Sequence, residues 1–170
     1  VFPTRSLSAF LDVYGDSIQP DVVISMPHGR LGDETVAYLK EKNIPLLTAL
    51  NVNVPQEEWE QSKQGMQGGF LSQSVATPEL DGAVRPYVVF ALQKNKDGVP
   101  VVQAIPERLQ SFVETVGRVV ALRKKRNSEK KIALFYYKGP GQSALSASGM
   151  EVVPSLYNLL LRLKKEGYRV

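Results

Sequence analysis

The stretch ATPELDG at residues 76–82 places two carboxylates, Glu79 and Asp81, between a proline and a glycine. The sequence also contains one histidine, His28, and no cysteine. A carboxylate can hold a divalent cation or accept protons from a bound ligand, and a histidine can be an axial metal ligand or carry a proton near neutral pH. These residue types indicate metal or proton chemistry, and they exclude a thiolate zinc site, a cysteine nucleophile and a multi-histidine metal site.

The same stretch also has the composition of a polar turn. Pro78 fixes φ, Asp81 can close an Asx-turn and Gly82 accepts a positive φ. A turn therefore accounts for Asp81 without any chemistry, but it does not require Glu79. Glu79 is the stronger candidate for a reacting carboxylate, and Asp81 stays open between a structural role and metal binding.

His28 follows a nearly continuous apolar run at residues 21–26, which is typical of a strand buried on both faces of a parallel sheet. The glycine-flanked loop at residues 27–32 should then lie at the carboxyl edge of that sheet, where open α/β folds bind ligands. The alternative is a histidine satisfied by hydrogen bonds to loop carbonyls.

Periodicity, capping signals and apolar runs predict the other elements. Helices are expected at residues 6–14, at 33–42 with Asp33 as N-cap and Asn43 closing it, and at 55–63, where Pro55 opens the helix and Trp59 anchors it. A long helix should begin at Pro106 and turn an apolar face inward, formed by Leu109, Phe112, Val113, Val116, Val119 and Val120. A last helix should run from Pro154 to Gly167, with Leu156, Leu159, Leu160 and Leu163 as its apolar residues. Strands are expected at residues 44–47, 87–92, 101–105 and 132–137, with Val170 entering another. Residues 87–92 and 101–105 should form an antiparallel hairpin, and the glycine-rich residues 65–74 should form a loop.

This order of elements predicts an α/β fold that contains parts of two Rossmann-like or flavodoxin-like three-layer units, with an intervening β-hairpin and a long helix. Residues 1–128 would form the first unit, without its amino-terminal part, and residues 129–170 the start of the second. We expect the chain to be a fragment of a longer protein.

Composition narrows the function further. The chain has 170 residues, 43% of them hydrophobic, and a formal net charge of +4, to which residues 123–131 contribute six cations against one glutamate. We interpret that basic run as a solvated helix end and expect no nucleic-acid partner. No apolar run is long enough to span a bilayer, and we expect a cytoplasmic location.

Two other patterns are less specific. Met66, Phe70, Tyr136 and Tyr137 could face a flat aromatic ligand, although such residues also suit an ordinary core. The loop at residues 139–141 has neither Walker lysine spacing nor a dinucleotide fingerprint, so we expect no nucleotide there.

Four motifs occur in an order found in one family: PELDG at 78–82, IPERLQ at 105–110, LRKKRNSEKKIALFYYKGPG at 122–141 and VPSLYNLLLRLKKEGY at 153–168. The chain resembles the cobaltochelatase (CobN) and magnesium-chelatase large (H) subunit family from about residue 21 to residue 170. The loop at residues 25–34 departs from the more apolar pattern of that family, and its histidine suits an iron porphyrin.

The resemblance implies a subunit that binds a porphyrin or corrin ring and inserts a divalent metal, cobalt or magnesium, while separate AAA+ subunits hydrolyse ATP. It places the family's acidic motif on Glu79 and Asp81, with Glu79 delivering the metal or taking the pyrrole protons, and it implies that the isolated fragment is inactive. From this motif together with the position of His28, we expect Glu79 and His28 to be catalytic residues and Glu79, His28 and Asp81 to be metal ligands. Two alternatives stay open. One is a related dechelatase that removes metal from haem or another tetrapyrrole, and the other is a noncatalytic α/β module that docks partner subunits.

Overall fold

The structure is a computed structural model that describes residues 17, 19–26, 28–135, 146–147 and 150–170. The chain divides into two compact units, Val1–Val120 and Ala121–Val170, which we describe separately. The expected helix at 6–14 lies outside the described residues. The border between two α/β units that the sequence indicated, between residues 128 and 129, stays a prediction.

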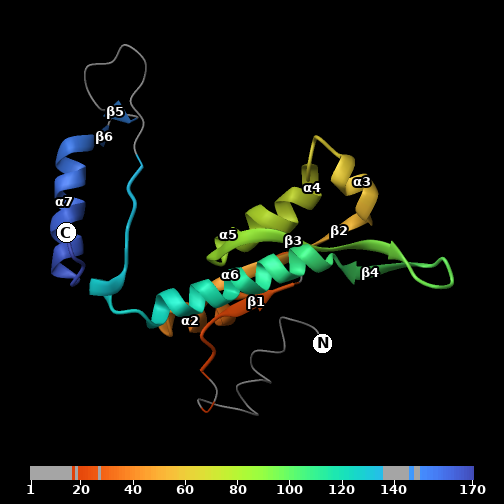
Figure 1. Cartoon of the computed structure of the whole chain (residues 1–170), viewed down its shortest axis with the longest axis horizontal. Coiled ribbons are helices and arrows are strands. Elements are labelled where there is room, and N and C mark those ends of the chain that lie inside the picture. The colour runs from red at the N-terminus through yellow and green to blue at the C-terminus, as the bar shows by residue number, and fades with distance from the viewer. Residues whose placement is uncertain (1–16, 18, 27, 136–145, 148–149) are drawn as a thin grey trace. The chain divides into compact units, whose positions relative to one another are not determined.

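The first unit is a mixed α/β structure (Figure 1). Its elements are β1 (Val23–Ser25), α2 (Asp33–Glu41), β2 (Leu46–Pro55), α3 (Gln56–Gln61), α4 (Gly68–Leu71), the π-helix η2 (Ser72–Ala76), α5 (Thr77–Leu80), β3 (Ala83–Lys94), β4 (Pro100–Ala104) and α6 (Pro106–Lys124), the last of which continues into the second unit. No helix among the described residues is long and apolar enough to cross a membrane.

The sheet has the order β1-β2-β3-β4. β1 pairs in parallel with β2, β2 pairs in parallel with β3, and β3 pairs antiparallel with β4. The predicted strand–helix–strand unit and the predicted hairpin are both confirmed, although β2 and β3 are longer than the sequence indicated. The carboxylate motif lies at the end of the parallel crossover from β2 to β3, directly before β3.

Helices cover both faces of this sheet (Figure 1). Leu39 of α2 packs with Leu46 of β2, whereas Phe112 of α6 packs with the neighbouring Leu47. Successive side chains of a strand point to opposite faces, so α2 and α6 lie on opposite sides. The predicted α/β class is confirmed.

α6 buries a narrower stripe than its apolar pattern indicated. Phe112, Val116 and Val119 pack against the sheet, at the spacing of one helical face. Leu109 and Val113 are 38% and 59% exposed, so their predicted inward placement is wrong. The sheet contacts one stripe of the helix, and these two side chains lie beside it.

Trp59 anchors α3 as predicted, and Arg108 of α6 completes this contact. Trp59 packs against a cluster of Val52, Ala91 and Ile105. The guanidinium carbon of Arg108 lies 4.7 Å from the Trp59 ring centroid, and its Nε donates a hydrogen bond of 2.6 Å to the carbonyl of Val88. The cation therefore ties the crossover to the long helix.

Four local predictions are corrected. The N-cap of α2 is Gly32, with φ of 94° and no side-chain cap, rather than Asp33. Pro55 is the last residue of β2 and the N-cap of α3, rather than the first residue of that helix. Residues 65–74 are not all loop, because α4 and η2 form within them. Residues 132–135 are not in a strand, and Phe135 is 96% exposed. No described strand of the second unit pairs with that apolar segment.

The second unit comprises the 3-10 turn η3 (Asn127–Glu129), the short pair β5 (Ser146–Ala147) and β6 (Met150–Glu151), and α7 (Val152–Lys165). α7 ends as predicted, because Gly167 has a φ of 84° and the amides of Gly167 and Tyr168 bond to the carbonyls of Lys164 and Leu163. No strand forms at Val170.

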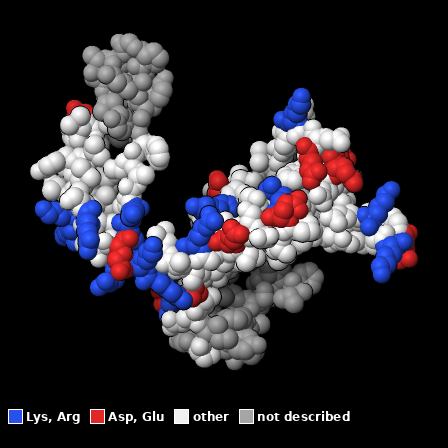
Figure 2. Space-filling view, in the orientation of Figure 1, with Lys and Arg blue, Asp and Glu red and all other residues white. Residues whose placement is uncertain are grey.

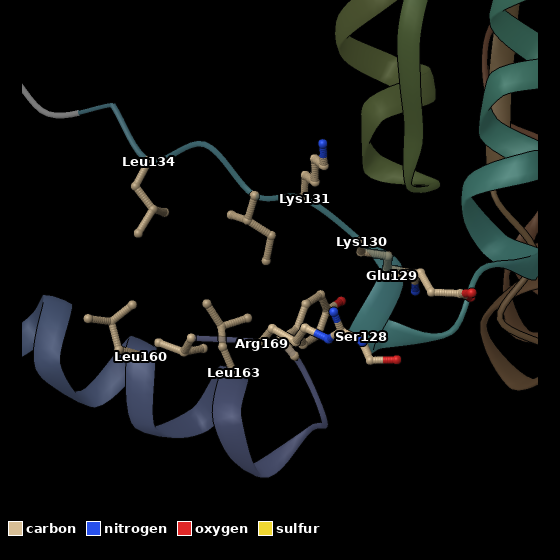
Figure 3. A pocket seen from close by; sticks show the side chains of 11 residues that line it. Ser128, Glu129, Lys130, Lys131, Leu134, Leu160, Leu163 and Arg169 are labelled. Atoms are coloured by element: carbon tan, nitrogen blue, oxygen red, sulfur yellow. The ribbon is translucent and has the colours of Figure 1, made fainter.

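A groove of about 520 Å³ lies within this unit, where Leu134 of the extended segment points toward Leu160 and Leu163 of α7 (Figure 3). Lys and Arg gather on the surface of this unit (Figure 2), and its described cations are Arg123, Lys124, Lys125, Arg126, Lys130, Lys131, Arg162, Lys164, Lys165 and Arg169. The groove contains no cluster of metal-ligating side chains among the described residues.

Candidate functional site

The carboxylate motif is the end of a helical segment. α4, η2 and α5 follow one another without a break from Gly68 to Leu80. The amide of Gly82 then donates to the carbonyl of Glu79, and Gly82 has a φ of 83°. The predicted positive φ at Gly82 is therefore confirmed, but Pro78 and Glu79 belong to a helix and not to an isolated turn.

Asp81 holds the loop that carries His28. Its side chain is fully buried, with Oδ1 accepting a hydrogen bond from Nε of Arg30 and Oδ2 accepting one of 2.6 Å from the amide of Leu31. Arg30 also contacts the exposed Asp33 at 3.2 Å. Both oxygens of Asp81 are thus in use, and its negative charge is compensated by a guanidinium.

His28, in the loop after β1, contacts the same helical segment further toward the amino end of that segment. Its Nδ1 is 2.8 Å from the hydroxyl of Ser74, and its ring centroid is 5.1 Å from that of Phe70. The amide of Gly29 donates to the carbonyl of Gln73 at 2.9 Å. Residue 28 as a whole is exposed and Nδ1 is bonded to Ser74, so we infer that Nε2 is the accessible ring nitrogen.

Glu79 differs from Asp81 in both burial and contacts. Its side chain is exposed, and its carboxylate makes no hydrogen bond or ion pair with another described residue. Along the helix axis Glu79 lies between Ser74 and Asp81, which are about 10 Å apart at roughly 1.5 Å per residue. The loop from His28 to Leu31 is therefore bonded to the helical segment on both sides of Glu79.

The described residues contain no group of three or more His, Cys, Asp or Glu side chains that could hold a metal ion. An ion that met His28 and Glu79 would need further ligands from a substrate or from other residues.

An apolar pocket of about 340 Å³ adjoins His28 through the shared residue Phe70. Trp59 and Met66 also line it, together with the polar Asn53. Phe70 and Met66 thus lie where a flat ligand could contact them. The other members of that predicted set, Tyr136 and Tyr137, and the loop at 139–141, lie outside the described residues.

Sequence reasoning missed Arg30 and Ser74. Arg30 pairs with a residue 51 positions away and Ser74 with one 46 positions away. A cationic partner is a common requirement of a buried aspartate, but no local pattern identifies which residue supplies it. No sequence pattern indicated a role for Ser74, which lies in a stretch expected to be a loop.

The sequence model of the CobN/Magnesium Chelatase family matches residues 4–170. The chain belongs to this family. The resemblance found in its four motifs is thereby confirmed over nearly the whole sequence.

Relatives in the family are much longer than this chain. Magnesium-chelatase subunit ChlH, chloroplastic, of Oryza sativa subsp. indica is 31% identical over 140 residues, which cover 81% of this chain and 10% of that protein. An uncharacterised protein of Methanocaldococcus jannaschii is 33% identical over 140 residues, covering 78% of this chain and 11% of that one. The chain therefore spans about a tenth of the curated relatives that it matches.

The fold agrees with a solved structure from the family. The catalytic subunit of cobaltochelatase from Mycobacterium tuberculosis has a TM-score of 0.80 to this chain at 22% identity, covering 99% of this chain and 15% of the other. The α/β arrangement described above is thus the fold of this region in the CobN/Magnesium Chelatase family.

Proposed function

We propose that this chain is part of the large subunit of a tetrapyrrole metal chelatase, which binds a porphyrin or corrin ring and inserts cobalt or magnesium. Family membership supports the class of reaction. The observation that carries the proposal is the contrast between Glu79, exposed and unbonded to other described residues, and Asp81, buried with both oxygens bonded.

In the proposed reaction Glu79 accepts protons from the pyrrole N–H groups as the metal approaches, because a carboxylate that no cation neutralises is available as a base. His28 meets the metal through Nε2 or receives the protons in turn. Asp81 holds the loop through Arg30 and Leu31, and these two hydrogen bonds favour a positioning role over metal ligation. The metal ion is a substrate here.

Further parts of the proposal concern the whole protein. We propose AAA+ partner subunits that hydrolyse ATP, with no nucleotide on this chain, and a cytoplasmic location. The second candidate is a dechelatase that removes metal from haem, and the exposed Nε2 of His28 favours it because imidazole is a common ligand of haem iron. In the third, noncatalytic docking, neither His28 nor Glu79 has a chemical role.

We also propose that residues 129–170 begin a second α/β unit. The groove in which Leu134 faces Leu160 and Leu163 of α7 supports this proposal, because apolar side chains of a neighbouring segment pack against a helix in the layers of an α/β unit.

Replacing Glu79 with glutamine in the protein that carries this chain tests the catalytic role. Ring binding, followed by porphyrin fluorescence, should stay within about threefold, while metal insertion should fall by about 100-fold or more, the usual contribution of a general base. Glu57→Gln, an exposed glutamate at the start of α3, is the matched control. Unchanged insertion and removal of metal in Glu79→Gln would contradict the catalytic role of Glu79 and favour a docking role for this chain.

A further inference from the structure

The hydroxyl of Ser74 is the one described hydrogen-bond partner of the His28 ring. We propose that Ser74 is a positioning residue, which accepts a hydrogen bond from Nδ1–H of His28 and thereby keeps the lone pair of the imidazole on the exposed Nε2. The direction of this bond, and its use in presenting Nε2 to a tetrapyrrole-bound metal, both rest on the proposed function, whereas the tautomer itself can be measured on this chain alone.

The burial of Ser74 makes this bond a strong constraint. Ser74 is 1% exposed, so its hydroxyl cannot turn to bulk water, and Oγ lies 2.8 Å from Nδ1. A buried hydroxyl without a partner is costly, and His28 is the partner that the described residues provide. The bond therefore fixes the histidine and gives the oxygen of Ser74 its described partner.

A second contact fixes the plane of the imidazole. Phe70 and Ser74 are four residues apart on the helical segment, and both contact His28, one through its ring and the other through its hydroxyl. The two rings are 5.1 Å apart and inclined by 54°. The loop backbone is held there as well, because the amide of Gly29 bonds to the carbonyl of Gln73. The imidazole is thus held by ring, hydroxyl and backbone contacts at one position.

The π-helix explains how a serine comes to present its hydroxyl at this point. η2 spans Ser72–Ala76, between α4 and α5. A π-turn contains one more residue than an α-turn, so it shifts the residues that follow it around the helix axis. Ser74 and Pro78 are buried on the body side, while Glu79 is exposed. The same segment can therefore support His28 and leave Glu79 accessible.

The chemistry of imidazole gives the bond its direction. A neutral imidazole has one N–H and one lone pair, and a histidine that ligates a metal almost always donates its other N–H to a neighbouring acceptor. Ser74 is an acceptor at the right distance from Nδ1. With Nδ1–H bonded to Ser74, Nε2 is the nitrogen available to a metal ion or a proton.

The tautomer can be measured directly, because the sequence contains a single histidine. We suggest long-range ¹H–¹⁵N NMR of the 170-residue chain at a pH where His28 is neutral, for the wild type, Ser74→Ala and Ser74→Thr. The wild type should show Nδ1 protonated and Nε2 unprotonated. Ser74→Ala should show a mixture of tautomers, and Ser74→Thr, which keeps a hydroxyl, should return toward the wild-type pattern. Backbone spectra show whether each variant is folded.

Binding of iron protoporphyrin, followed by its Soret band, separates this inference from the proposed function. If His28 is a ligand, Ser74→Ala should weaken binding by roughly 10-fold, the usual effect of losing the partner of a ligating histidine, and His28→Ala should change the spectrum. A wild-type Nε2–H tautomer, or a tautomer that Ser74→Ala leaves unchanged, would overturn the role of Ser74. Identical spectra in His28→Ala would remove His28 as a ligand while the tautomer result stands.

Discussion

Asp81 provides the sharpest test of how the site is held together. Asp81→Ala removes the acceptor of two hydrogen bonds, one from Nε of Arg30 and one from the amide of Leu31. The lost carboxylate is fully buried, and the two donors come from a segment distant in sequence. We therefore expect the substitution to destabilise the first unit and to release the loop that carries His28.

The magnitude follows from the burial of each partner. A hydrogen bond to a charged group contributes about 1.5–3 kcal/mol. The side chain of Arg30 is 43% exposed, so water recovers part of its loss when the carboxylate is removed. We expect Asp81→Ala to lower the free energy of unfolding by about 2–4 kcal/mol. For a chain of this size that loss corresponds to a fall in Tm of about 5–15 °C.

Arg30 supplies a matched control. The side chain of its second carboxylate partner, Asp33, is 98% exposed, and Oδ1 of Asp33 lies 3.2 Å from the guanidinium of Arg30. An exposed ion pair contributes about 0–1 kcal/mol to stability. Asp33→Ala should therefore change the stability little. Asp81→Asn preserves the shape of the side chain, but its NH₂ group would face either Nε of Arg30 or the amide of Leu31, and both of these are donors. The loss of stability in Asp81→Asn should therefore lie close to that in Asp81→Ala.

The assay is urea unfolding followed by the fluorescence of Trp59. The sequence has one tryptophan, and it lies in the first unit, so the signal reports that unit separately from the second. Hydrogen exchange of the Leu31 amide gives a local measure, and it should accelerate in Asp81→Ala. The reasoning would be refuted if Asp81→Ala cost no more stability than Asp33→Ala.

Gly82→Ala should cost about 1–2 kcal/mol, since Gly82 has a φ of 83° with open space around its Cα, whereas Gly117→Ala in the interior of α6 should stabilise by about 0.5–1 kcal/mol. Urea unfolding measures both, and changes of the same sign would contradict the conformational argument. In the second unit, the side-chain hydrogen bond from Arg126 lowers the pKa of Glu129, so its contribution to stability is present above the unfolded pKa and disappears as the pH falls through the folded pKa. An NMR titration should find the Glu129 pKa below its ordinary value and rising in Arg126→Ala; equal pKa values in the two proteins would show that the bond does not form.

The sequence predicted those parts of the fold that local pattern determines. The apolar run before His28, the hairpin and the helix from Pro106 all have the period or the length of their elements. The helical segment from Gly68 was missed because glycine and serine have low helix propensity. Its stability comes from tertiary contacts, such as the buried Ser74 and the carbonyl of Gln73 bonded to Gly29, and no local pattern indicates these.

The sequence indicated individual residues of the candidate site, but not which of them contact one another. The sequence separated Glu79 from Asp81 by giving Asp81 a role in a local turn, whereas in the structure Asp81 is buried and bonds to Arg30 and Leu31 while Glu79 is exposed. The bonds from Asp81 to Arg30 and from Ser74 to His28 join segments about fifty residues apart. Such pairings follow from topology, because the crossover from β2 to β3 brings the helical segment against the loop after β1.

The double attachment of the loop from His28 to Leu31 has an entropic consequence. Ordering a backbone residue costs about 1–2 kcal/mol, and for this loop that cost is met during folding, through Ser74 at one end and Asp81 at the other. A ligand that reaches Nε2 of His28 then encounters a rigid surface and loses little affinity to loop ordering. In an Asp81 variant the loop would be ordered only when the ligand binds. The affinity for the ligand would therefore fall, although Asp81 does not contact it.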